Sequence, residues 1–133
     1  MTLNALNNKQ LPIYGNGLQI RDWIHVEDHA NGVLSAMLAL YVGGISSGEV
    51  FNFGADNEQK NIDIVKKIIS QTNASDSLVN FVKDRPGHDK RYAMKYKKAE
   101  KVLGWKPEID WNTGLVKTIQ WYTMNTDWVD STK

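Results

Sequence analysis

Apolar and polar positions change period several times along the chain, and each change marks an expected element. Residues 19–26 alternate between two faces, a pattern typical of a strand. From Val26 to Tyr41 the apolar residues recur at helical spacing, with Glu27 and Asp28 in the first turn. A helix is therefore expected to begin at Val26 and to end at the glycine pair 43–44.

The other segments continue this alternation of strands and helices. Asn61 is expected to cap a helix with apolar positions up to residue 69, and Gly104 to end a short helix over 96–103. Asp110 or Asn112 is expected to cap the final helix. Further elements are the tail of a helix at 3–8 and strands at 11–17, 49–54 and 78–82. The predicted fold class is therefore α/β or α+β.

Length and composition indicate a single globular domain over residues 1–133. Hydrophobic residues make up 41% and charged residues 23% of the chain. The lack of cysteine excludes disulfides, thiolate metal sites and a cysteine nucleophile, and is compatible with a cytoplasmic location. No apolar run approaches the roughly 20 residues that cross a bilayer, so no membrane partner is expected.

The net charge of +1 hides a strongly basic window. Eight of the 16 Lys and Arg residues fall between Lys83 and Lys101, among only three acids. Within it, Pro86-Gly87 is expected to form a tight turn that aims Arg85 and His88 at one point, where guanidinium groups suit phosphate. The lysines alternatively form a solvated helix face. Asp84 and Asp89 either hold Arg85 and Arg91, whose guanidinium groups are the candidate phosphate ligands, or neutralise them. Lys9, Arg21 and Asn61 are candidate partners of the turn if the fold brings them near.

The motifs of several common chemistries are missing from the sequence. There is no Gly-x-Ser-x-Gly and no His-Glu-x-x-His, and His25 and His29 read as isolated structural residues. Gly15 and Gly17 lack the third glycine and the following helix that a dinucleotide site needs. No tyrosine is followed four residues later by lysine. We therefore expect no catalytic residue, no metal site and no NAD site in this chain.

Four quoted stretches carry a family resemblance: "KQLPIYGNGLQIRDWIHVEDHANGV", "NFGADNEQKNIDIV", "DRPGHDKRYAM" and "LGWKP". In this order they resemble the C-terminal part of the dTDP-glucose 4,6-dehydratases, which are extended short-chain dehydrogenase/reductase enzymes. The likeness covers about residues 4 to 129. It implies the substrate-binding portion of an extended Rossmann-type sugar-nucleotide enzyme, without its Rossmann NAD domain.

The resemblance also implies a set of substrate-binding residues. The first segment binds the nucleotide, an arginine and the "DRPGH" turn bind the diphosphate, and an asparagine makes a further contact. In this sequence these positions are Lys9, Leu11, Pro12, Ile13, Tyr14, Arg21, Asn61, Asp84, Arg85, Pro86, Gly87 and His88.

The reaction that the resemblance implies is an internal redox dehydration. NAD⁺ takes hydride from C4 of dTDP-glucose, water leaves across C5–C6, and hydride returns to C6 to give a 4-keto-6-deoxy sugar. The NAD loop and the catalytic Tyr and Lys of the family lie upstream of the matching part. The chain is therefore expected to be a truncated product that is inactive alone and does not bind NAD.

Other readings stay open beside this one. The chain is alternatively part of another NAD-dependent sugar-nucleotide dehydratase, epimerase or decarboxylase, or a free-standing nucleotide-sugar-binding module. Nucleic-acid binding is not expected, because no recognition motif accompanies the basic window. Full-length members of the family are usually homodimers. Without the nucleotide domain, apolar surface would be exposed, so we expect marginal stability or self-association.

Overall fold

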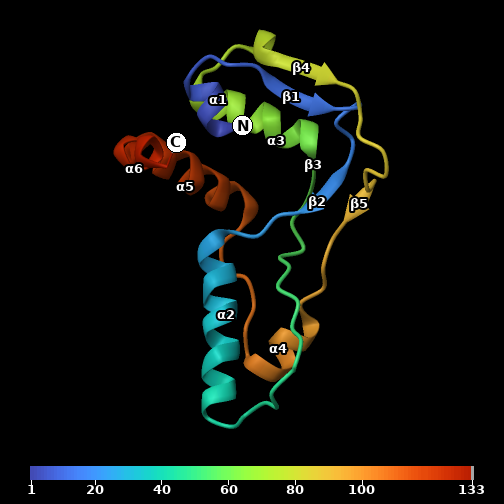
Figure 1. The fold of residues 1–133 in the computed structure, drawn as a ribbon, viewed down its shortest axis with the longest axis vertical. Helices are drawn as coiled ribbons and strands as arrows, with labels where there is room; N and C mark the ends of the chain where they lie inside the picture. Colours follow the sequence, from blue (N-terminus) through green and yellow to red (C-terminus); the bar gives the residue numbers. More distant parts are fainter. Residues whose placement is uncertain (133) are drawn as a thin grey trace. The chain divides into compact units, whose positions relative to one another are not determined.

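The computed structural model describes residues 1–132 and separates into two compact units, each built from discontinuous stretches (Figure 1). The first unit consists of residues 1–21, residues 59–91 and the chain from Leu115 onward. The second unit consists of residues 22–58 and 92–114. Each unit is described by itself below. No helix among residues 1–132 is both long enough and apolar enough to cross a membrane.

A pair of parallel strands forms the centre of the first unit. Strand β1 (Leu11–Tyr14) pairs in parallel with β4 (Val79–Val82), in the register Leu11↔Val79 to Tyr14↔Val82. Helix α3 (Asn61–Thr72) packs on β1, and α1 (Thr2–Leu6) packs against α3 (Figure 1). A 3₁₀ turn, η1 (Asp76–Leu78), precedes β4. The predicted strands at 11–17 and 78–82 are confirmed, with shorter bounds.

Side-chain periodicity explains these elements. Leu11 and Ile13 are buried while Pro12 and Tyr14 are exposed, the period of two expected of a strand with one covered face. Helix α3 buries a helical stripe against them, made of Ile64, Val65, Ile68 and Ile69.

Asn61 does not cap α3 as the sequence suggested. The N-cap residue is Lys60, whose side chain makes no capping hydrogen bond. The backbone N–H of Asn61 donates instead to the carbonyl oxygen of Gln19 at 3.0 Å. Because a distant carbonyl satisfies this donor, the helix can begin without a side-chain cap.

A second sheet has three very short strands in the order β3–β2–β5: β3 is Glu58–Lys60, β2 is Ile20–Asp22 and β5 is Arg91–Tyr92. The chain passes from one unit to the other within each of these strands. The strand predicted over 19–26 is therefore shorter than expected. It ends at Asp22, and α2 (Val26–Tyr41) begins after three further residues, with His25 as its N-cap accepting from the N–H of Glu27.

The second unit is organised by a buried carboxylate on α2. Asp28 is 3% exposed, and its two oxygens accept the backbone N–H groups of Glu108 at 3.2 Å and Ile109 at 3.0 Å. The indole N–H of buried Trp105 donates to the Asp28 carbonyl at 3.0 Å. Helix α4 (Lys97–Leu103) packs on α2 and ends, as predicted, at Gly104 with φ of 67°. These three hydrogen bonds tie the loop after α4 to the start of α2.

The strand predicted over 49–54 is not formed. Phe53 packs edge-on against Trp105 at 4.8 Å between ring centroids, and the ammonium of Lys98 lies 4.8 Å from the Phe51 ring. No strand among residues 1–132 pairs with this segment. The alternating apolar residues of this segment therefore take part in aromatic packing and not in hydrogen-bonded strand pairing.

The last two helices are α5 (Trp111–Met124) and α6 (Thr126–Ser131). Asp110 caps α5, as predicted, by accepting from the N–H groups of Asn112 and Thr113 at 3.0 and 3.2 Å. The hydrogen bonds from Thr113 are the main cause of a lowered pKa of Asp110. Helix α6 buries Val129 in the first unit.

The apolar stripe that predicted α2 faces solvent in this structure. Its exposed members include Leu34 at 51%, Met37 at 63% and Tyr41 at 89% of full exposure. Large unpaired apolar surface favours association in water. The self-association expected from the sequence therefore stays a prediction, with this stripe as its basis.

We predict that replacing Asp28 by Ala lowers the free energy of unfolding by about 1–3 kcal/mol, because two part-buried N–H donors lose their buried acceptor. Chemical denaturation followed by tryptophan fluorescence measures this, since Trp105 contacts Asp28 directly. The control is Glu100→Ala on the exposed surface of α4, which should leave the midpoint nearly unchanged. Equal effects of the two substitutions would contradict the assigned role.

We also predict that the sedimentation coefficient of the chain rises with protein concentration. Met37→Glu places a charge in the exposed stripe of α2 and should shift the population toward monomer. Asn31→Glu adds the same charge at an exposed polar position of the same helix and should not. A single monomeric species of the unmodified chain at all concentrations would refute the prediction.

Candidate functional site

The cationic turn follows β4 directly. Arg85, Pro86 and Gly87 are exposed, and Gly87 has a φ of 69°, a conformation that glycine adopts without strain. The side chain of His88, by contrast, is only 6% exposed. The turn therefore presents Arg85 to solvent and turns His88 inward.

The Asp84 carboxylate holds this turn together. Its Oδ1 accepts the backbone N–H of Arg85 at 2.9 Å and Nδ1–H of His88 at 2.6 Å. Its Oδ2 accepts an N–H of the Gln19 side-chain amide at 2.9 Å. The hydrogen bond from His88, together with those from Arg85 and Gln19, lowers the pKa of Asp84 below its ordinary value.

These contacts decide between the two roles that the sequence left open for Asp84. Both of its oxygens are occupied by donors other than the Arg85 guanidinium. No ion pair of Arg85 occurs within residues 1–132. Asp84 thus shapes the turn without neutralising its arginine, and the guanidinium keeps its capacity to bind an anion.

The end of β1 meets the same turn. The Tyr14 ring lies edge-on to the His88 ring at 6.2 Å between centroids, and the N–H of Gly15 donates to the Val82 carbonyl at 2.9 Å. A Cβ at Gly15, which has a φ of 59°, would lie 2.8 Å from Asp84 Oδ2. The loops after both parallel strands therefore converge, at the strand edge where α/β sheets commonly bind ligands.

Gln19 is a residue of this cluster that the sequence analysis missed. It is 7% exposed, and its carbonyl accepts from Asn61 while its amide donates to Asp84. Its Oε1 is buried and has no hydrogen-bond partner within the described chain, which costs about 1–3 kcal/mol for such a group. Nothing in the local pattern marked it, because its side-chain partner lies 65 positions away.

Arg21 braces the far side of the turn. One guanidinium nitrogen, Nη1, donates to the carbonyls of Ile20 at 2.7 Å and Asp89 at 3.0 Å. One nitrogen of the Arg21 guanidinium is therefore already hydrogen-bonded to backbone carbonyls. Its position beside Asp89 brings it into the same neighbourhood as the Asp84–His88 turn.

The remaining predicted site residues divide by exposure. Leu11 and Ile13 are buried in the core, so they support β1 rather than face solvent. Pro12 is exposed on the strand, and Lys9 is exposed before the strand begins, at the end away from Tyr14. The structure thus brings together Tyr14, Arg21, Asn61 and the Asp84–His88 turn, and leaves Lys9 outside the hydrogen-bonded cluster.

The Gly15–Gly17 turn does not have the form of a dinucleotide site. It leads to β2 rather than to a helix, and a Cβ at Gly17 would lie 2.8 Å from the Ile13 side chain. These glycines therefore serve close packing within the first unit. Residues 1–132 also contain no cluster of three potential metal ligands.

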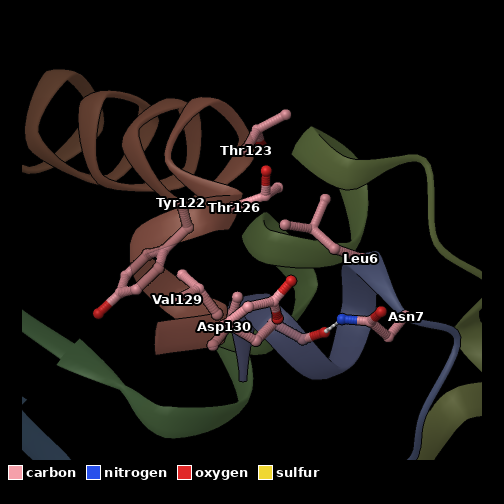
Figure 2. Close-up of a pocket in the computed structure, with 8 residues that line it drawn as sticks. Leu6, Asn7, Tyr122, Thr123, Thr126, Val129 and Asp130 are labelled. Carbon is pink, nitrogen blue, oxygen red and sulfur yellow. Dashed lines mark hydrogen bonds between the residues drawn. The ribbon is translucent and has the colours of Figure 1, made fainter. Parts of the chain in front are cut away.

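A separate pocket of about 260 Å³ lies among α1, α5 and α6 of the first unit (Figure 2). It shares no residue with the turn. Asn7 at its edge donates its side-chain amide to the Leu3 carbonyl at 2.7 Å. The pocket is lined by Leu3, Leu6, Asn7, Tyr122, Thr123, Thr126, Val129 and Asp130.

Comparison with known proteins adds a family context to this geometry. Residues 1–118 match the sequence profile of the family described as GDP-mannose 4,6 dehydratase. The chain is 45% identical over 138 aligned positions to dTDP-glucose 4,6-dehydratase 1 of Escherichia coli, and 47% over 135 to a probable dTDP-glucose 4,6-dehydratase of Sinorhizobium fredii. The matches cover 98% and 96% of this chain but 37% of each relative.

Solved structures give the same result for the fold. A dTDP-glucose 4,6-dehydratase of Bacillus anthracis in complex with NAD matches with a TM-score of 0.81 and 38% identity, over 96% of this chain and 39% of that one. The Streptomyces venezuelae dTDP-glucose 4,6-dehydratase, solved with NAD and TYD bound, gives 0.83 and 35%, over 96% and 38%. A Thermotoga maritima UDP-glucose 4-epimerase with UDP-glucose gives 0.81 and 26%, over 94% and 38%. The resemblance noted in the sequence is confirmed.

We predict that Asp84→Asn destabilises the first unit in a pH-dependent way. The lowered pKa of Asp84 means that its ionised form stabilises the fold above its ordinary pKa of 3.8. That contribution is lost as the pH falls through the lower folded-state pKa. The difference in melting temperature between wild type and variant, measured from pH 7 to pH 2.5, should therefore shrink toward zero at the acidic end. A difference independent of pH would count against the hydrogen-bonded carboxylate.

Proposed function

The chain belongs to the GDP-mannose 4,6-dehydratase family, and on that premise we propose that residues 1–133 are the substrate-binding part of an NAD-dependent dTDP-glucose 4,6-dehydratase. The choice of dTDP-glucose is supported by relatives of that name at 42–47% identity. The observation that carries the binding role is the turn after β4, where a fixed carboxylate leaves an arginine unneutralised. Two phosphates bound at a strand edge need such fixed cationic donors.

We assign the diphosphate to the cationic members of the cluster. The exposed guanidinium of Arg85 offers bidentate donors, and the Arg21 nitrogens beyond Nη1 offer more. Pro86 and Gly87 give the turn its shape, while Asp84 and His88 anchor it. In this proposal Asp84 acts by holding the turn and not by touching phosphate.

The nucleoside and sugar are assigned to the residues around the end of β1. Tyr14 is half-exposed beside His88, so its ring offers a stacking face to a base. Asn61, in the first turn of α3, offers an amide to the ligand. Lys9 and Pro12 are exposed and extend this surface, and Leu11 and Ile13 support it from the core.

NAD would supply the hydride acceptor and donor of the proposed reaction. The described residues do not form a dinucleotide turn, so we assign neither NAD binding nor any catalytic step to them. The chain spans less than two-fifths of the length of its curated relatives. We accordingly propose that the 133 residues alone bind substrate without turning it over, and that the whole enzyme is a cytoplasmic homodimer.

The alternative is a different nucleotide. The family profile is described by GDP-mannose, and epimerases solved with UDP-sugars share the fold at 25–26% identity. The dehydratases with dTDP in their names are more similar, at 35–38% among the solved structures. These candidate substrates differ in their nucleotide base, so the preference of the chain for one base distinguishes them experimentally. A free-standing nucleotide-sugar-binding module would share the binding and not the reaction.

We predict that dTDP binds the purified chain more tightly than UDP or GDP in isothermal titration calorimetry. Arg85→Ala should weaken dTDP binding at least tenfold, or about 1.4 kcal/mol, because a charge-assisted bidentate contact is lost. Lys83→Ala removes an exposed cation just before the turn and serves as the matched control, with less than about a threefold effect.

Three outcomes are informative. Tightest binding of GDP or UDP would reassign the substrate within the same family. Equal losses in the two variants would mean that general positive charge, and not the Arg85 fork, binds the ligand. Absence of binding by all three nucleotides would refute an autonomous binding role for the chain.

A further inference from the structure

Gln19 connects the two ends of the proposed binding site. Its side-chain amide donates to Asp84 Oδ2 at 2.9 Å, and its backbone carbonyl accepts from the N–H of Asn61 at 3.0 Å. Asp84 in turn holds His88 and the backbone of Arg85. One buried residue therefore contacts both the anchor of the cationic turn and the first residue of α3.

The Gln19 side chain is poorly explained as a stabilising core residue. It is 93% buried, yet its Oε1 has no hydrogen-bond partner within residues 1–132. A buried carbonyl without a partner opposes stability, and an apolar side chain of the same length would avoid the penalty. What an apolar side chain would lose is the N–H donated to Asp84.

The Asp84 carboxylate needs that donor to keep its orientation. Its Oδ1 faces two groups of its own turn, so these bonds fix the turn internally and not relative to the rest of the unit. The bond from Gln19 to Oδ2 is the one side-chain hydrogen bond found among the described residues that ties Asp84 to a distant part of the unit. The close approach of Gly15 to the same oxygen leaves little space for another side chain there.

We propose that Gln19 is a positioning residue that sets the cationic turn in register with α3, so that Arg85 and Asn61 face one ligand. The identity of that ligand rests on the proposed function. The brace, by which we mean the hydrogen bonds of Gln19 to Asp84 and Asn61, does not. Gln19 acts through Asp84 and touches no substrate.

The test compares Gln19→Met with wild type in the ¹⁵N-labelled 133-residue chain. The methionine keeps the length and removes the donor. The ¹⁵N order parameters of Arg85, Gly87 and His88 should fall from about 0.85 to below about 0.6, and the His88 ring resonances should shift. The unfolding midpoint should change little, because loss of the Asp84 bond is offset by removal of the unpaired Oε1. Affinity for dTDP should fall about tenfold.

Gln71→Met is the matched control, since Gln71 is exposed on α3 and no side-chain hydrogen bond joins it to the turn among residues 1–132. It should change none of these readouts. If Gln19→Met does not fold, Gln19→Glu replaces it. The introduced carboxylate repels Asp84 at neutral pH and should displace the turn in the same way.

The readouts separate failure of the brace from failure of the proposed function. Unchanged turn dynamics in the Gln19 variants would overturn the brace, whatever happens to nucleotide binding. Increased turn mobility with unchanged dTDP affinity would overturn the positioning role. A wild-type chain that binds no dTDP would contradict the proposed function, and the order parameters would then decide the brace alone.

Discussion

The cationic turn after β4 depends on the hydrogen bonds of one carboxylate. Asp84 accepts from Arg85, His88 and Gln19, and Gly15 leaves room for it by having no side chain. A carboxylate with these donors stays ionised and in one orientation. Because both of its oxygens accept hydrogen bonds from other groups, it forms no ion pair within residues 1–132 with the guanidinium of the next residue, Arg85. The Asp84 carboxylate thus stabilises the turn, while the Arg85 guanidinium remains available to bind an anion.

The parallel pairing of β1 and β4 explains why the Asp84–His88 turn lies beside the loop that follows β1. Parallel strands place both of their carboxyl ends at one edge, and the loops that leave that edge carry Gly15 and Asp84. Residues about 70 positions apart in sequence therefore become neighbours without a long insertion.

Local patterns were sufficient for the elements whose determinants are local. The strand expected at 11–17, the helical stripe of α2 and the glycine after α4 each correspond to an observed element. The expected strand at 49–54 failed because a strand also requires a pairing partner, and this segment packs its rings instead. Asn61 was misread as a cap because its N–H has a partner 42 positions upstream. The candidate site shows the same contrast between local and distant determinants. The sequence identified the cationic turn from neighbouring residues. The role of Asp84 and the involvement of Gln19 depend on contacts between distant positions, so sequence spacing does not reveal them.

The division of the chain into discontinuous units has a consequence for biosynthesis. The first unit begins with residues 1–21 but is completed only by the segment from Leu115 onward, which contributes Ile119 and Val129 to its core. During translation, β1 leaves the ribosome long before β4 and the last two helices exist. Its buried residues Leu11 and Ile13 therefore stay uncovered at least until α3 and β4 have also emerged. The first unit can therefore complete its fold only after both segments of the second unit have been synthesised, because they lie between its own segments in the sequence.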